Sequence, residues 1–90
     1  MAKVVWTAHA VRNLRTIQLY IGEFSPLASQ RMAIRLKAAT EGLNDFPDKG
    51  VPISGGRRQL TQVSPYLIRY QRQGDLVIIL DIRHGAEDAS

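Results

Sequence analysis

Arginine gives this sequence its clearest capacity for chemistry. Four arginines and no acidic residue lie between positions 57 and 72, and another follows near the end of the last apolar segment. A guanidinium group binds phosphate or carboxylate through two parallel hydrogen bonds, so an arginine cluster predicts contact with an anionic partner. The candidate residues for this basic patch are Arg57, Arg58, Arg69, Arg72 and Arg83. The alternative interpretation is a solvated surface that mainly keeps the protein in solution.

His84 is a second candidate, because an imidazole can transfer protons near neutral pH. The sequence shows no nucleophile or carboxylate paired with His84. The chain has no cysteine and two histidines, which are too few ligands for a zinc site. We therefore expect no catalytic residue, no metal ion and no cofactor. His84 is interpreted as a structural residue where the chain leaves a sheet, with a role in a functional tail as the alternative. Tyr66 and Tyr70 lie at alternate strand positions, which favours the core over base stacking.

Two amphipathic helices are predicted in the first half of the chain. Residues 3–6 are a short β-like segment, and Thr7 can cap the helix that follows. A second helix begins at Ser25-Pro26 and ends before Pro47. Because the joint between them is one or two residues long, the helices should form an antiparallel hairpin. The predicted buried faces are Val11, Leu14, Ile17, Ile21 and Phe24 in the first helix, and Ala28, Met32, Leu36, Ala39, Leu43 and Phe46 in the second.

Strands dominate the second half of the chain, after a loop over residues 48–56. The predicted strands are 57–63, 66–73 and 76–83. The last of them is apolar at consecutive positions, which predicts a central strand covered on both faces. Gly74 supplies the positive φ that a tight hairpin turn requires. The order β-α-α-β-β-β predicts an α+β fold in which a helical hairpin packs on a small, mostly antiparallel sheet.

Composition predicts one ordinary globular domain over residues 1–90, because 44% of the residues are hydrophobic and 22% are charged. The net charge of +4 suits either nucleic acid or an acidic protein partner, and composition does not separate the two. The longest apolar run, 76–80, ends at Asp81, and residues 1–6 lack the apolar segment of a signal peptide. We expect a cytoplasmic protein that makes no membrane contact.

Several short segments, spread over almost the whole chain, together have the order and spacing of one protein family. They are Leu14, Ile17 and Tyr20-Ile21 for the pattern DL..I..YI, Ser25-Pro26 with Ala28 for P.AA, Leu43 with Phe46-Pro47 for L...P, Pro65–Tyr70 for PY.I.Y, and Ile78–Gly85 for v.IL.V.HG. With these segments, the chain resembles the ParE/RelE superfamily of bacterial toxins from type II toxin–antitoxin pairs.

The resemblance implies one of two mechanisms. RelE-like members cut ribosome-bound mRNA and need cations to stabilise the reacting phosphate. Leu60, Leu67 and Glu87 stand here where that branch carries cations. The resemblance therefore implies the ParE-like branch: a growth-arresting toxin that inhibits DNA gyrase and is not an enzyme. A RelE-like endoribonuclease and a non-toxic binding domain on the same scaffold are the alternatives.

The ParE-like branch also implies a partner. A cognate ParD-like antitoxin of the ribbon-helix-helix class is expected to form a hetero-oligomer with the toxin, and nucleic-acid binding by the toxin alone is not expected. An amphipathic antitoxin segment needs apolar surface, either in a groove or at an open sheet edge. The apolar residues outside the main helix faces are Trp6, Leu19, Leu27 and Ile34, which either bind the antitoxin or complete the core.

Overall fold

The computed structural model describes residues 2–88, with side chains as far as Ala86. Within this part of the chain the strands are β1 (Lys3–Trp6), β2 (Val51–Pro52), β3 (Arg58–Leu60), β4 (Tyr66–Gln73) and β5 (Leu76–His84), the helices are α1 (Ala8–Gly22) and α2 (Pro26–Glu41), and the 3-10 turns are η1 (Gly42–Asn44), η2 (Ser54–Gly56) and η3 (Gly85–Asp88).

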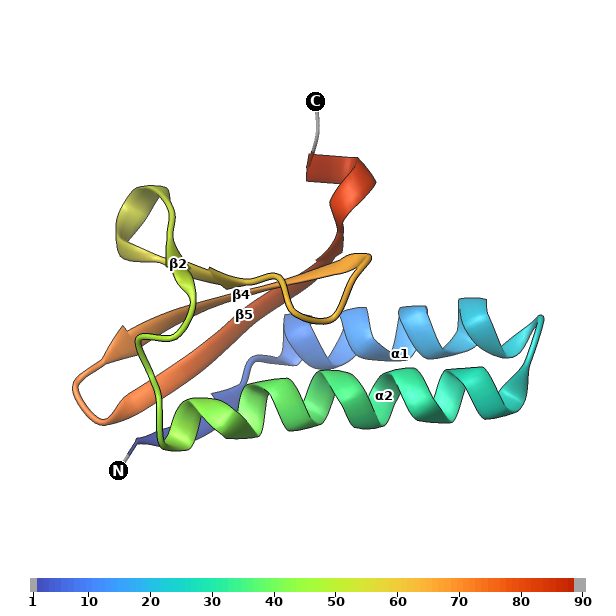
Figure 1. The fold of residues 1–90 in the computed structure, drawn as a ribbon, viewed down its shortest axis with the longest axis horizontal. Helices are drawn as coiled ribbons and strands as arrows, with labels where there is room; N and C mark the ends of the chain where they lie inside the picture. Colours follow the sequence, from blue (N-terminus) through green and yellow to red (C-terminus); the bar gives the residue numbers. More distant parts are fainter. Residues whose placement is uncertain (1, 89–90) are drawn as a thin grey trace.

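The described strands form one sheet in the order β1-β5-β4-β3-β2, with α1 and α2 side by side against one of its faces (Figure 1). β1 pairs with β5 in parallel, and the other neighbours are antiparallel. The predicted α+β fold is confirmed. Two details differ from prediction: the predicted strand 57–63 is a strand only over β3, and the loop before it contributes the short edge strand β2.

Both helix starts follow the predicted capping chemistry. The Thr7 hydroxyl accepts a hydrogen bond from the Ala10 backbone N–H at 3.1 Å, and Ser25 accepts one from Ala28 at the same distance. These bonds satisfy amide groups that have no partner within the first helical turn. Pro26 occupies the first position of α2, where its missing N–H costs no hydrogen bond.

The predicted buried face of each helix is correct in its middle and wrong at its ends. In α1, Leu14 and Ile17 are buried as expected, but Val11 is 51% exposed and Phe24, just beyond the helix, is 75% exposed. In α2 and the segment that follows it, Leu36, Ala39 and Leu43 are buried as predicted, but Ala28 and Phe46 are exposed. The α1–α2 turn lies beyond the end of the sheet (Figure 1), so Phe24 and Ala28, which adjoin that turn, have no strand to pack on.

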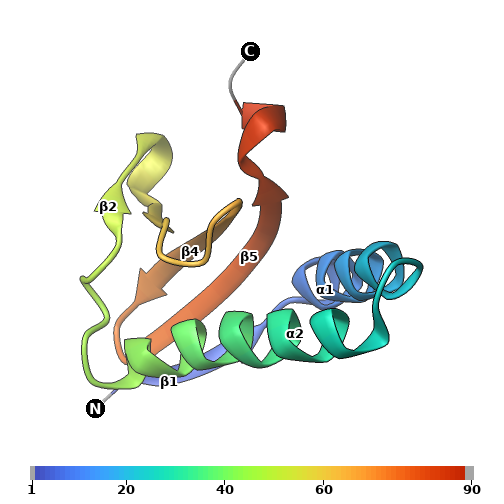
Figure 2. The same ribbon diagram turned by 45° about the vertical axis from the view of Figure 1, so that its right-hand side comes forward.

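The sequence predicts that β5 is covered on both faces, and this prediction is also wrong. In the part of the chain that the structure describes, the helices lie on one side of the sheet and leave the other side open (Figure 2). Val77, Ile79 and Ile82 face the helices and are buried, whereas Ile78 and Leu80 are only half-buried. We call the side of the sheet away from the helices the open face.

A β-bulge in β5 sets which of its residues reach the core. Arg69 pairs with Asp81 and Tyr70 pairs with Ile79, so Leu80 is an extra residue without a direct partner on β4. Strict alternation would send Asp81 toward the helices together with Ile79. The extra residue shifts the alternation by one, so that Ile82 is buried and the carboxylate lies on the open face.

α1 and its N-cap residue Thr7 satisfy the backbone groups at this bulge. The Thr7 hydroxyl donates to the carbonyl oxygens of Ile79 at 2.9 Å and Leu80 at 3.1 Å. The Ile82 N–H donates to Oδ1 of Asn13 at 3.0 Å. Buried backbone groups need such partners, so these two polar side chains stabilise the irregular strand.

Asn13→Ala should lower the free energy of unfolding by about 1–3 kcal/mol, because it leaves the Ile82 N–H without its acceptor. Thr16→Ala is the matched control, since Thr16 is exposed on the same helix and its loss should change stability by about 0.5 kcal/mol or less. Urea denaturation followed by far-ultraviolet circular dichroism measures both. Equal midpoints for the two variants would show that the Asn13 bond does not support the bulge.

Candidate functional site

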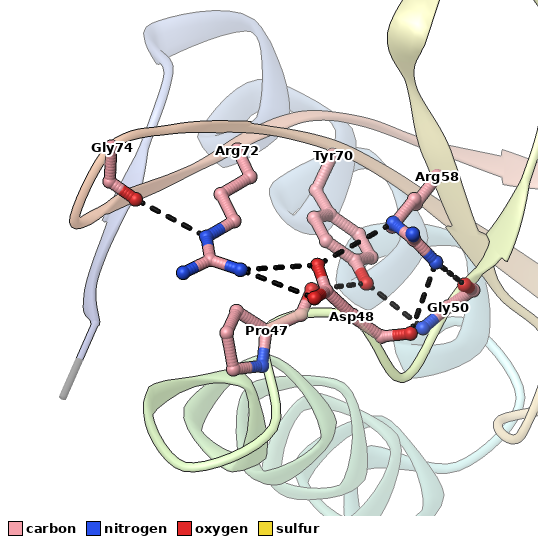
Figure 3. A network of polar contacts seen from close by, with 7 residues as sticks. All are labelled: Pro47, Asp48, Gly50, Arg58, Tyr70, Arg72 and Gly74. Atoms are coloured by element: carbon pink, nitrogen blue, oxygen red, sulfur yellow. Dashed lines mark hydrogen bonds and ion pairs between the residues drawn. The ribbon is translucent and has the colours of Figure 1, made fainter.

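Two of the predicted patch arginines, Arg58 on β3 and Arg72 on β4, lie on the helix side of the sheet and share Asp48 (Figure 3). Arg72 Nη1 lies 3.1 Å from Asp48 Oδ2 and 3.3 Å from Oδ1, and Arg58 Nε lies 3.7 Å from Oδ1. Arg58 Nη1 also donates to the carbonyl oxygens of Asp48 at 3.0 Å and Gly50 at 2.7 Å. Both side chains therefore hold the loop that follows η1.

Tyr70 holds the same loop from inside the core (Figure 3). Its hydroxyl donates to the Pro47 carbonyl at 2.8 Å and accepts from the Gly50 N–H at 2.8 Å. Burial raises the pKa of the Tyr70 phenol, which favours the neutral form that can donate. Tyr66 is buried as well, and burial raises its pKa in the same direction. Both tyrosines are core residues, as their spacing predicts.

Arg69 and Arg83 lie on the open face. Antiparallel partners share a face, so Arg69 lies beside Gln59, and its Nε donates to Gln59 Oε1 at 3.2 Å. Arg69 is also directly opposite Asp81 on β5, and Arg83 Nε is 3.6 Å from Asp81 Oδ1. Strand alternation thus separates these two arginines from Arg58 and Arg72, and the predicted basic residues do not form one continuous patch.

Arg57 and His84 each make local contacts at an end of the sheet. Arg57 Nε donates to the Ser54 carbonyl at 3.0 Å, within the loop around η2. His84 Nδ1 accepts from the Ala86 N–H at 3.1 Å, and its ring meets that of Tyr66 edge-on at 5.6 Å between centroids. These contacts agree with the interpretation of His84 as a residue that directs the chain out of the sheet.

The segment after His84, to which the alternative interpretation assigns a functional tail, is only partly described. The backbone continues through η3, but the side chains of Glu87 and Asp88 lie outside the described residues. Among the side chains that the structure describes, those of residues 2–86, no three histidine, aspartate or glutamate residues gather in a way that would hold a metal ion. In the same range, no helix is long and apolar enough to cross a membrane.

A groove between β1, α1 and the end of α2 is the main feature that sequence reasoning missed. Its volume is about 650 Å³, and Trp6, Val4 and Leu14 supply apolar surface. The charged residues that line it are Lys3, Arg15, Lys37 and Glu41. Because these residues come from three elements, neither their spacing nor the local charge reveals that they meet. We call this the Trp6 groove.

The other predicted apolar candidates lie elsewhere. Leu19, Leu27 and Ile34 are between 54% and 67% exposed, as expected from their positions off the main helix faces. They are not among the described residues that line the Trp6 groove. A second groove of about 520 Å³ lies where the helices extend past the sheet, lined by Thr16, Ile17, Tyr20, Ile21, Met32, Pro65, Tyr66 and His84.

Comparison with known proteins decides the family. The model of the ParE toxin of the type II toxin–antitoxin system parDE matches residues 4–89. The chain belongs to the ParE toxin family. This assignment confirms the predicted membership of the ParE/RelE superfamily and makes the chain the toxin component of a type II toxin–antitoxin pair.

The chain is also similar to two known proteins, one in sequence and one in fold. Toxin RelE2 of Caulobacter vibrioides is 50% identical over 86 residues, which cover 96% of this chain and 98% of the relative. A solved structure described as the chromosomal ParDE TA system from P. aeruginosa contains a chain of the same fold, with a TM-score of 0.80 and 21% identity. That likeness covers 93% of this ParE-family chain and 96% of the other.

Proposed function

We propose that this ParE-family toxin acts in the cytoplasm by binding and inhibiting DNA gyrase, and that it does not cleave mRNA. The observation that carries the proposal is the placement of a carboxylate beside arginines on each face of the sheet. Asp48 lies beside Arg58 and Arg72, and Asp81 lies beside Arg83. Phosphodiester cleavage needs cations that stabilise the negative charge developing on the phosphate. A carboxylate within 4 Å of an arginine partly cancels the positive charge of that arginine and so weakens this stabilisation.

The positions of Leu60 and Leu67 give further support. Both side chains are uncharged, so neither position supplies the cation that the RelE-like branch carries there. Leu60 is buried in the core, and Leu67 is half-buried on the open face. The relative at 50% identity bears the name RelE2, so mRNA cleavage is the outcome that an experiment must separate from gyrase inhibition.

Neutralisation by a ParD-like antitoxin of the ribbon-helix-helix class is the second part of the proposal. The Trp6 groove suits an amphipathic acidic segment, because Lys3, Arg15 and Lys37 line it against one acid, Glu41. Trp6 provides apolar surface inside it. The exposed side chains of Leu19, Leu27 and Ile34 offer further apolar contacts outside the groove. Arg57, with Arg69 and Arg83 on the open face, provides candidate contacts to gyrase or the antitoxin.

The purified toxin should inhibit supercoiling of relaxed plasmid by gyrase and should leave ribosome-bound mRNA intact in a translating extract. Added antitoxin should restore supercoiling and change the emission of Trp6, the one tryptophan in the chain. Gel electrophoresis of plasmid topoisomers, primer extension on the mRNA and fluorescence titration make the three measurements. Codon-specific mRNA cleavage without a gyrase effect would overturn the proposed mechanism. Restored supercoiling with unchanged Trp6 emission would place the antitoxin outside the Trp6 groove.

A further inference from the structure

The open face contains the one buried side-chain oxygen that has no hydrogen-bond partner among the described residues. Asp81 has a side chain only 16% exposed, and its Oδ1 is buried and makes no hydrogen bond within the described residues. Burial of an ionised carboxylate is unfavourable unless its oxygens have partners, so Asp81 is a poor choice for stability alone. A hydrophobic or hydroxyl side chain would fit a half-buried strand position better.

A specific backbone device brings Asp81 to this position. Without the bulge at Leu80, the carboxylate would point toward the helices. The bulge needs the bonds from Thr7 and Asn13 of α1, which lie more than 65 residues away along the chain. Two polar side chains, the N-cap Thr7 and Asn13 of α1, therefore support a strand geometry that has an acid on the open face.

Asp81 lies among the cations of that face. Arg69 is its direct cross-strand partner, and the Cβ atoms of such partners are about 4.5–5.5 Å apart. Arg83 Nε lies 3.6 Å from Asp81 Oδ1 and belongs to an exposed side chain. A shielded negative charge at these distances lowers the attraction of both guanidinium groups for an incoming anion, more strongly than an acid in open water would.

We propose that Asp81 is a specificity-determining residue that makes the open face reject a phosphodiester backbone such as that of single-stranded RNA, although two arginines lie there. This inference deepens the proposed function and rests on it, because it names the residue that separates a gyrase-binding toxin from an RNA-binding one. The face stays able to contact a protein, whose surface can offer donors and acceptors together. A phosphate backbone offers only negatively charged acceptors.

Asp81→Asn tests the proposal, because the amide has nearly the same shape and removes the charge. Asp75→Asn is the matched control: it makes the same change in net charge, but in the turn between β4 and β5. A fluorescein-labelled twelve-nucleotide oligouridine is the probe, titrated at low and moderate salt and followed by anisotropy. Asp81→Asn should bind it about fivefold more tightly than both the parent and Asp75→Asn, with a steeper dependence on salt.

A double variant locates the effect. Arg83→Gln added to Asp81→Asn should remove most of the gain, because the freed guanidinium group is the proposed contact. If Asp81→Asn does not fold, Asp81→Thr replaces it, since threonine suits a strand. Equal affinities of the Asp81 and Asp75 variants, or a parent that already binds the probe as tightly, would overturn the inference. Gyrase inhibition by the parent is measured separately, so failure of the proposed function remains distinguishable.

Discussion

Leu43→Ala should lower the free energy of unfolding by about 2–5 kcal/mol, the largest effect we expect from one substitution in the core. Leu43 lies in η1, directly after α2, and is completely buried. Truncation removes apolar contacts and leaves a cavity that the surrounding side chains fill only in part. For a domain of this size the loss is a large share of a total near 5–15 kcal/mol.

Urea denaturation followed by Trp6 fluorescence and far-ultraviolet circular dichroism measures the Leu43 effect. Ile34→Ala is the matched control, because Ile34 is 67% exposed in α2 and its truncation should change stability by about 0.5 kcal/mol or less. A Leu43→Ala midpoint close to that of Ile34→Ala would mean that η1 does not anchor the core.

Gly50→Ala should be the most damaging change among the glycines, with an expected loss of about 2–5 kcal/mol. A Cβ at this position would lie 2.7 Å from Cε1 and 2.8 Å from the hydroxyl oxygen of Tyr70, and 3.1 Å from the Gln59 carbonyl oxygen. The Tyr70 ring cannot easily retreat, because it is fully buried and its hydroxyl bonds to Pro47 and Gly50. Gly50 is therefore required because Tyr70 leaves no space for a side chain at this position.

Gly42→Ala is the control for this prediction. Gly42 has a right-handed helical backbone, with φ of −59°, and an added Cβ would meet nothing within 4 Å. Alanine should therefore leave stability unchanged or raise it by about 0.4–1 kcal/mol, because it restricts the unfolded chain. The midpoint of thermal unfolding compares the two variants. Equal unfolding midpoints for Gly50→Ala and Gly42→Ala would show that Tyr70 moves away from the added Cβ at little cost in stability.

Much of the fold was predictable because it depends on neighbours in the sequence. Thr7 and Ser25 cap the helices as expected, and Gly74 has the positive φ of 59° that its turn requires. Capping and turn formation involve residues within a few positions of each other, so a sequence pattern contains most of the information. The succession of these elements, with its characteristic segments, also indicated the toxin family.

The placement of the functional candidates was not predictable in this way. The basic residues look like one cluster along the chain, but sheet pairing puts Arg58 and Arg72 on one face with Asp48 and puts Arg69 on the other. The Trp6 groove likewise exists only because β1, α1 and α2 meet. Local charge and periodicity do not specify which strands pair or which acids approach across the fold.

The sequence by itself determined the superfamily of this protein and the types and order of its main elements, apart from the short edge strand β2. The tertiary structure decided the β5 bulge, and with it the exchange that buries Ile82 and sends Asp81 to the open face. The physical reason is that a strand's side-chain alternation has a period of two, so one extra residue reverses every later position. Whether that residue is tolerated depends on hydrogen bonds from Thr7 and Asn13, which only the folded chain brings to β5.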